Sequence, residues 1–198
     1  MIFKTDSALD ADLFAISCSQ AAEHSQPAFV GCIEYNPEGV FERWLAEGDG
    51  RAAVNKALRS AAGKKPASPQ KVPGNEYTVD QLGRICEGPI ELLLGLDVAA
   101  VVADGTDARP DKTLDNGLKF DVKGSRVRPE NSFAIPCWQA MTGKYDALLL
   151  VQHVRPGLVR VWACKCEKGP GWEQRPPARA GNKPFFRIAC PEPETAEA

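Results

Sequence analysis

The chain has 198 residues, which is enough for one domain with a substantial core or for two small domains. Its 43% apolar and 25% charged residues are ordinary for a globular protein, and no apolar run approaches the ~20 residues that cross a bilayer. The acidic first segment, MIFKTDSALDADLF, does not have the basic region and apolar stretch of a secretory signal. We therefore expect a cytoplasmic protein with no membrane partner.

The net charge of −2 hides an uneven distribution along the chain. Residues 1–108 hold 9 basic and 16 acidic residues, a net charge of −7, whereas residues 109–190 hold 15 and 7, a net charge of +8. The final eight residues, 191–198, form an acidic tail with three glutamates. A cationic region is what a polyanionic partner requires, although a solvated basic surface explains the charge equally well.

The seven cysteines have irregular spacing and an odd number, which indicates reduced thiols rather than a disulfide framework. Cys164 and Cys166 would face the same side of a strand, but no second pair lies at zinc-finger spacing. We interpret them as small apolar core residues.

The first sixty residues give weak signals. The segment 27–39 is compatible with a short strand and a turn. The following segment has helical spacing at Val40, Phe41, Trp44 and Leu45, interrupted by the residues EGDG. Residues 61–76 contain three prolines and two glycines and are typical of a linker or loop. We therefore expect residues 1–60 to form an N-terminal appendage.

A helix is predicted to begin at Thr78, where TVDQ forms a capping-box pattern with Gln81. Pro89 should kink or restart this helix, and Gly95 is a plausible end. Beyond it we expect a strand at DVAAVVAD, a hairpin, a buried strand in YDALLLVQHV and a half-buried strand in LVRVWACKC, with KPFFRIACP as a further edge strand. This order predicts an α/β domain at residues 77–190, with one mixed sheet formed from residues 78–166.

The hairpin carries the most informative side chains. The residues DNG at 115–117 favour a tight turn, and a turn centred on Asn116 would place Asp111 opposite Asp121. Strand alternation then puts Lys119, Asp121 and Lys123 on one face and apolar residues on the other. Opposed carboxylates destabilise a sheet unless a cation such as Mg²⁺ lies between them.

This arrangement resembles the PD-(D/E)xK nuclease superfamily, whose motif is a helix glutamate, then Pro-Asp, then Asp/Glu-x-Lys on the next strand. Pro110-Asp111 and Asp121-Val122-Lys123 match the two later parts, and NGLKFDVKGSR is similar to the hairpin of phage and bacterial members. The resemblance covers roughly residues 76–168. It implies a restriction-endonuclease-like core, with a mixed central sheet flanked by helices, and hydrolysis of nucleic-acid phosphodiester bonds, preferably in DNA, with Mg²⁺ or Mn²⁺.

The resemblance also implies roles for the hairpin residues. Asp111 would be the central metal ligand and Asp121 the second, with the carbonyl of Val122 as a third. Lys123 would position or activate the attacking water. Asp107 competes with Asp111, because DGTD also resembles a metal-site loop.

The helix acid of the superfamily has two candidates here. Glu87 has the expected spacing to Leu94-Gly95-Leu96, and Glu91 lies one turn later on nearly the same face. Pro89 between them departs from the family pattern, so a nucleic-acid-binding module of the same fold without catalysis is the alternative. The oligomeric state is open, and a homodimer is one option. Four further residues are candidates for contacts with nucleic acid: Ser125, Arg126, Arg128 and Gln139.

Overall fold

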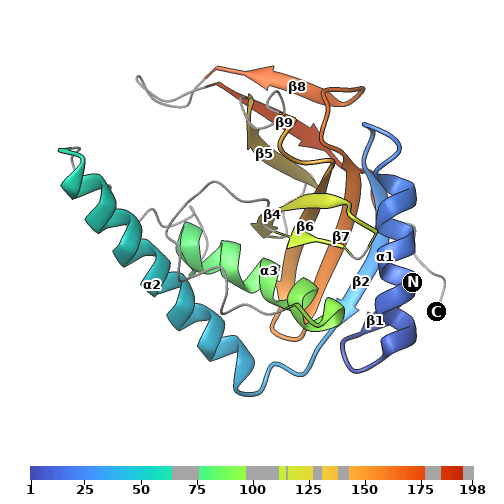
Figure 1. Ribbon diagram of the computed structural model, residues 1–198, viewed down its shortest axis with the longest axis horizontal. Coiled ribbons are helices and arrows are strands. Elements are labelled where there is room, and N and C mark those ends of the chain that lie inside the picture. The colour runs from blue at the N-terminus through green and yellow to red at the C-terminus, as the bar shows by residue number, and fades with distance from the viewer. Residues whose placement is uncertain are drawn as a thin grey trace.

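The computed structural model describes residues 1–63, 76–96, 112–114, 116–126, 131–137, 143–176 and 184–193. Within these residues, a six-stranded sheet carries three helices on one face and a three-stranded sheet on the other (Figure 1). The predicted α/β class with a mixed sheet is confirmed.

The larger sheet has the strand order β1-β2-β7-β6-β4-β3. Strand β4 is parallel to β6 and β1 is parallel to β2, whereas the other neighbours are antiparallel. Buried β6 lies near the middle, as its continuous apolar run predicts. The strands are β1 (Ile2–Lys4), β2 (Ala28–Glu34), β3 (Lys112–Thr113), β4 (Lys119–Arg126), β6 (Ala147–Arg155) and β7 (Leu158–Lys165).

The three helices share one core with the larger sheet. They are α1 (Ala8–Ala21), α2 (Val40–Ala61) and α3 (Val79–Leu94). Phe120 and Val122 of β4 belong to this core, as do Leu149 and Val151 of β6. Helix α3 lies so close to β4 that a side chain on Gly124 would meet the Cys86 sulfur at 3.0 Å.

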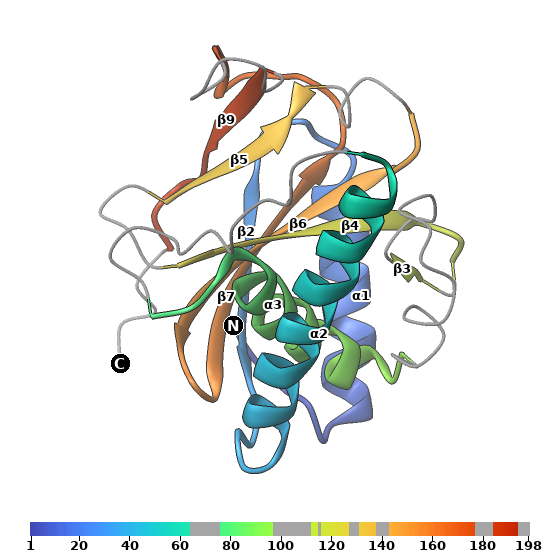
Figure 2. The same cartoon turned by 90° about the vertical axis from the view of Figure 1, so that its left-hand side faces the viewer.

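The opposite face is covered by strands rather than helices. Leu148, Leu150 and Trp162 of the larger sheet form a second core with the small sheet β5-β9-β8, which lies across the larger sheet from the helices (Figure 2). Residues 78–166 therefore do not form one sheet, and the strand predicted near the C-terminus is the middle strand of three. The bounds are β5 (Ser132–Pro136), β8 (Trp172–Arg175) and β9 (Phe185–Ala189).

Residues 1–60 differ from the expected appendage. They supply β1 and β2, and β2 pairs with β7 from Ala28 to Glu34. Phe3, Phe14 and Ile33 are 0% exposed within the helix-side core. Residues 1–60 are therefore part of the main domain: β2 covers the edge of β7, and Phe3, Phe14 and Ile33 pack in the helix-side core.

Helix α3 follows its sequence signals closely. Thr78 accepts from the backbone N–H of Gln81 at 3.2 Å, and the Gln81 side chain accepts from the Thr78 N–H at 2.9 Å. Gly95 ends the helix with a φ of 61°. Pro89 lies inside one continuous helix, so the predicted restart does not occur. The expected linker at 61–76 and the strand at DVAAVVAD lie largely or wholly outside the described residues.

Helix α2 runs without a break through the EGDG segment. Gly48 allows this helix to cross α3, because a side chain there would lie 2.6 Å from the Cα of Gln81. Among the described helices, none combines the length and apolar character needed to cross a membrane.

Candidate functional site

The β3–β4 hairpin has the predicted register. Lys112 pairs with Phe120 and Thr113 pairs with Lys119, so partner numbers sum to 232 as the turn at Asn116 requires. Gly117 has a φ of 85°, and its N–H donates to the carbonyl of Leu114. Asp111, which the sequence predicts opposite Asp121, lies outside the described residues.

Asp121 and Lys123 lie together on one face of β4. The Nζ atom of Lys123 is 2.7 Å from Oδ2 of Asp121. Asp121 is 1% exposed, whereas the Lys123 side chain is 22% exposed. A buried carboxylate beside a partly exposed ammonium is a charged pair that the sheet holds in a fixed position.

Strand alternation decides which core this pair faces. Phe120 and Val122 point toward the helices, so Asp121 and Lys123 point toward the small sheet. The pairing of Asp121 with Leu148 agrees, because Leu148 belongs to the small-sheet core. Ser125 shares this face but is 7% exposed, so it is buried and not a surface contact.

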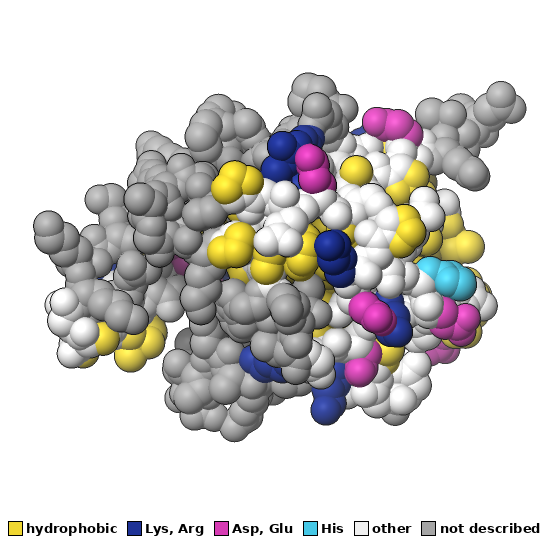
Figure 3. Space-filling view, turned by 90° about the horizontal axis from the view of Figure 1, so that it is seen from above, with side chains coloured by type: hydrophobic (Ala, Val, Ile, Leu, Met, Phe, Trp, Pro, Cys, Tyr) yellow, Lys and Arg dark blue, Asp and Glu magenta, His cyan; other side chains and the backbone are white. Residues whose placement is uncertain are grey.

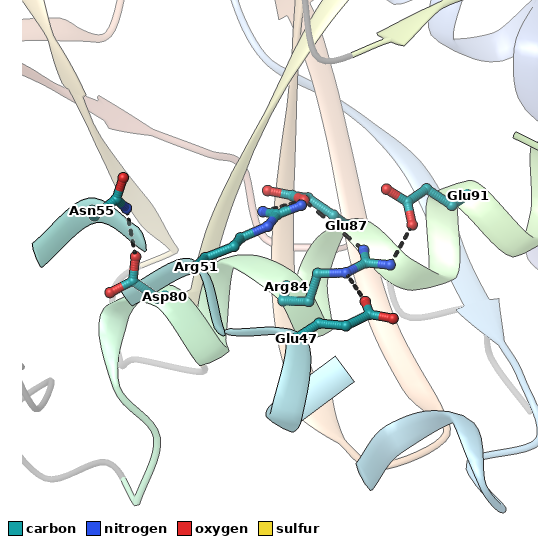
Figure 4. Close-up of polar contacts among 7 residues, drawn as sticks. All are labelled: Glu47, Arg51, Asn55, Asp80, Arg84, Glu87 and Glu91. Carbon is teal, nitrogen blue, oxygen red and sulfur yellow. Dashed lines mark hydrogen bonds and ion pairs between the residues drawn. The ribbon is translucent and has the colours of Figure 1, made fainter. Parts of the chain in front are cut away.

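The two helix glutamates lie on the other side of the larger sheet. Oε2 of Glu91 is 2.6 Å from the guanidinium of Arg84, and Oε2 of Glu87 is 2.8 Å from that of Arg51. Figure 4 shows these carboxylates directed at the arginines between α2 and α3. The structure therefore does not bring Glu87 or Glu91 together with Asp121.

Arg84 is the centre of this second group. It is 0% exposed, it pairs with Glu47 of α2 at 2.5 Å, and its guanidinium carbon lies 5.8 Å from the centre of the Trp44 ring. A buried arginine needs such partners because an unpaired charge in the interior is strongly unfavourable. The helix acids predicted as metal ligands thus have a structural role in this arrangement.

Asp146 is an acid near the site that the sequence analysis missed. Its Oδ2 accepts a hydrogen bond from the Lys119 N–H at 2.8 Å, immediately before β6. Burial, together with the nearby carboxylates of Asp121 and Asp146 and against the opposing charge of Lys123, raises the pKa of the Cys166 thiol to about 11. The acid just before an apolar run in KYDALLLV was the available signal.

The cysteines behave as the sequence predicted. All seven are free thiols, and Cys164 and Cys166 are both buried in the small-sheet core. Burial raises the pKa of Cys164 to about 12, so this thiol stays protonated and apolar at neutral pH.

The described residues alone do not make a metal centre. Within them, no three His, Cys, Asp or Glu side chains come together to hold a metal ion. Val122 is described, and its carbonyl remains a candidate ligand. Five other candidates cannot be placed: Asp107, Asp111, Arg128 and Gln139 are outside the described residues, and of Arg126 only the backbone in β4 is described.

The surface in Figure 3 carries both signs of charge. On this face, basic and acidic side chains alternate with hydrophobic ones among the residues drawn in colour, without a continuous basic patch.

No protein-family model, curated protein or solved structure matches the chain.

Proposed function

We propose that the protein is a metal-dependent nuclease that hydrolyses phosphodiester bonds in nucleic acid, with DNA as the favoured substrate. The observation that carries this proposal is the Asp121–Lys123 pair, 2.7 Å apart on one face of a hairpin strand. The hairpin register supports it, because Lys112 pairs with Phe120 and Thr113 with Lys119, as the proposal that Asp111 lies opposite Asp121 requires. These are the positions at which the PD-(D/E)xK motif has its carboxylates and lysine.

The roles follow from the chemistry of the side chains. Asp121, the carbonyl of Val122 and Asp111 would hold Mg²⁺ or Mn²⁺, both of which prefer oxygen ligands. The metal would supply charge stabilisation at the phosphate and a more acidic bound water. Lys123 would orient the attacking water and stabilise negative charge as the water oxygen bonds to phosphorus and the bond to the leaving oxygen breaks.

A second candidate is a nucleic-acid-binding module that performs no chemistry. It is favoured by the positions of Glu87 and Glu91, which pair with arginines across the sheet from Asp121. In this case the Asp121–Lys123 pair would be a structural ion pair.

The decisive experiment uses linear, circular and branched DNA with Mg²⁺ or Mn²⁺. We expect cleavage by the wild-type protein that stops in excess EDTA. Asp121→Asn should abolish cleavage and weaken metal binding, because an amide is a poorer ligand for a hard cation than a carboxylate. Lys123→Ala should retain metal binding but lose roughly 10²- to 10³-fold in rate.

Lys119→Ala is the matched control for Lys123→Ala. Lys119 lies on the same strand and the same face, is exposed, and pairs with Thr113, so its loss should leave the rate nearly unchanged. Circular dichroism should show an intact fold in each variant. Cleavage in EDTA, or normal activity in Asp121→Asn, would refute the mechanism, and DNA binding without any cleavage would favour the second candidate.

A further inference from the structure

A glutamine interrupts the apolar run of β6. Gln152 is 1% exposed, and its side chain lies on the same face of the larger sheet as Leu148 and Leu150, toward the small sheet. Asp121 and Lys123 occupy this face on the neighbouring strand β4, which runs parallel to β6. A buried amide at this position must have hydrogen-bond partners, because buried polar groups are otherwise unfavourable.

The partners of Gln152 form a chain of hydrogen bonds. Nη1 of Arg160, on β7, donates to Oε1 of Gln152 at 3.4 Å, and Nε2 of Gln152 donates to Oδ1 of Asn131 at 3.1 Å. Asn131 directly precedes β5 and is 6% exposed. We call Arg160, Gln152 and Asn131 the donor chain. It connects two strands of the larger sheet with the start of the small sheet.

Arg160 fixes the orientation of both amides in the donor chain. A guanidinium can only donate, so Gln152 must turn its oxygen toward Arg160 and its nitrogen toward Asn131. Asn131 must then turn its oxygen toward Gln152, which directs its Nδ2 atom away from the chain. Turning over either amide, or both, would place two donors face to face. The donor at the end of the chain is therefore set by chemistry.

This last donor is unsatisfied. Nδ2 of Asn131 is buried and has no hydrogen-bond partner among the described residues. A buried amide N–H without an acceptor destabilises the folded state. Native proteins rarely keep such a group unless it binds an acceptor from outside the chain.

The charge of Arg160 indicates which kind of acceptor fits. Arg160 is half-buried, and within the described part of the chain its one hydrogen bond is to the uncharged Gln152. Glu34 lies on the same face of the sheet, opposite Leu158, but forms no ion pair with Arg160. A guanidinium without a carboxylate partner, together with an oriented amide donor, favours an anion with several acceptor oxygens, as a phosphate has.

We propose that the donor chain binds a backbone phosphate of the nucleic acid whose neighbouring phosphodiester lies at Asp121 and Lys123. This inference rests on the proposed function for its choice of ligand. Gln152 pairs with Ser125, two residues beyond Lys123 on β4, so its Cα lies roughly 8 Å from that of Lys123 by strand rise and spacing. The contact would hold the nucleic-acid strand in register without reading its bases.

The test measures DNA binding separately from cleavage. Fluorescence anisotropy with short single- and double-stranded DNA in EDTA, from about 50 to about 200 mM salt, gives the affinity and its salt dependence. Arg160→Gln keeps a donor for Gln152 but removes the charge. We expect the affinity to fall about tenfold and the slope of log K against log salt to become shallower by about one.

Arg155→Gln is the matched control for Arg160→Gln. Arg155 is an exposed arginine at the other side of the β6–β7 turn, where its side chain donates to the carbonyl of Pro156. The variant makes the same change in net charge. It should leave the affinity and the salt slope nearly unchanged, because a distant exposed charge is screened by salt.

Asn131→Asp tests the unsatisfied donor directly. The variant keeps an oxygen facing Gln152 but replaces Nδ2 with a carboxylate oxygen, which repels a phosphate, so we expect at least about a tenfold loss of affinity. Asn131→Ala removes the donor without adding charge and should cause a smaller loss. Denaturant unfolding shows whether each variant folds, and if Asn131→Asp does not, Asn131→Ala and Arg160→Gln still decide the question.

The outcomes separate this inference from the nuclease proposal. DNA binding that depends on Arg160 and Asn131, in a protein that cleaves nothing with Mg²⁺ or Mn²⁺, would contradict the nuclease and support the phosphate contact. Cleavage with unchanged affinity and salt slope in both Arg160→Gln and Asn131→Ala would overturn the phosphate contact alone.

A free phosphate ligand is the remaining alternative for the donor chain. Thermal unfolding with millimolar inorganic phosphate, compared with chloride at equal ionic strength, detects it. Phosphate that stabilises the wild type but not Arg160→Gln, while both proteins bind DNA equally well, would assign the donor chain to a free anion and overturn the proposal.

Discussion

At the scale of single residues, His153 shows how position in the fold sets the chemistry of a side chain. It is 6% exposed on β6, stacked on Phe41 with ring centres 5.7 Å apart, and it meets Tyr77 edge-on at 5.6 Å. Its Nδ1 is buried and has no hydrogen-bond partner among the described residues. Burial lowers the pKa of His153 to about 4, although the charge of Glu76 acts in the opposite direction.

This burial predicts a pH-dependent stability. The unfolded chain binds a proton at His153 near pH 6.5, whereas the folded chain does so only near pH 4. The free energy of unfolding should therefore be highest above pH 6.5 and should fall, by at most about 3 kcal/mol, as the pH decreases toward 4.

Denaturant unfolding at several pH values measures this effect. In His153→Phe, which keeps an aromatic ring against Phe41, the dependence between pH 4 and pH 6.5 should become shallower. His24→Gln, at an exposed histidine, should retain the wild-type slope. An unchanged slope in His153→Phe would mean that other groups cause the acid sensitivity.

At the scale of elements, the interface between α2 and α3 combines close packing with buried charge. A side chain on Gly88 would lie 2.1 Å from the Trp44 ring, so only glycine permits this approach. Arg84 fills the neighbouring space and pairs with Glu47 and Glu91. The acids on α3 are thus needed to neutralise Arg84 as the two helices meet.

Glu91→Gln separates the structural role of Glu91 from a metal-binding one. Arg84 would keep Glu47 but lose a partner at 2.6 Å, and we expect the free energy of unfolding to fall by about 1 to 3 kcal/mol. Affinity for Mg²⁺ or Mn²⁺, measured by calorimetry, should stay the same. Glu42→Gln, an exposed acid in the first turn of α2, is the control for stability.

A large loss of metal affinity in Glu91→Gln, with little change in stability, would contradict the structural role. It would return Glu91 to the metal site suggested by the family resemblance.

The sequence predicted those elements whose signals are local. The capping box at Thr78 and Gln81, the turn at Asn116 and the strands flanking Pro156 all depend on residues close in sequence, and each is present in the structure. The pairing of Asp121 with Lys123 also follows from strand alternation alone.

The rest depended on contacts between distant residues. Strands β5 and β8 are only five and four residues long and become strands by pairing with β9. The positions of Glu87 and Glu91 could not be predicted for a similar reason, because helical spacing identifies the residues on one face but not the side of the sheet on which the helix lies.

At the scale of the whole molecule, one sheet organises two cores. Val159 and Val161 of β7 face the helices, whereas Trp162 and Cys164 face the small sheet. Strand β7 pairs with β2 on one side and with β6 on the other. The N-terminal segment therefore completes both the edge of this sheet and its helix-side core, and the basic C-terminal half cannot bury its apolar surface alone.

This arrangement predicts the outcome of a truncation. A fragment of residues 77–198 would lack β1, β2, α1 and α2, so the β7 edge and the apolar residues beneath α1 would be open to water. We expect this fragment to aggregate or to show no cooperative thermal transition, because exposed strand edges and apolar faces promote association. A chain that ends at Pro193 is the control: it removes part of the acidic tail but keeps the carbonyl of Pro191 that accepts from the Trp162 indole at 3.0 Å, so it should unfold like the full chain. If residues 77–198 instead unfold cooperatively at a temperature close to that of the whole protein, the N-terminal segment is dispensable for folding, and its strands are an addition to a domain that is already complete.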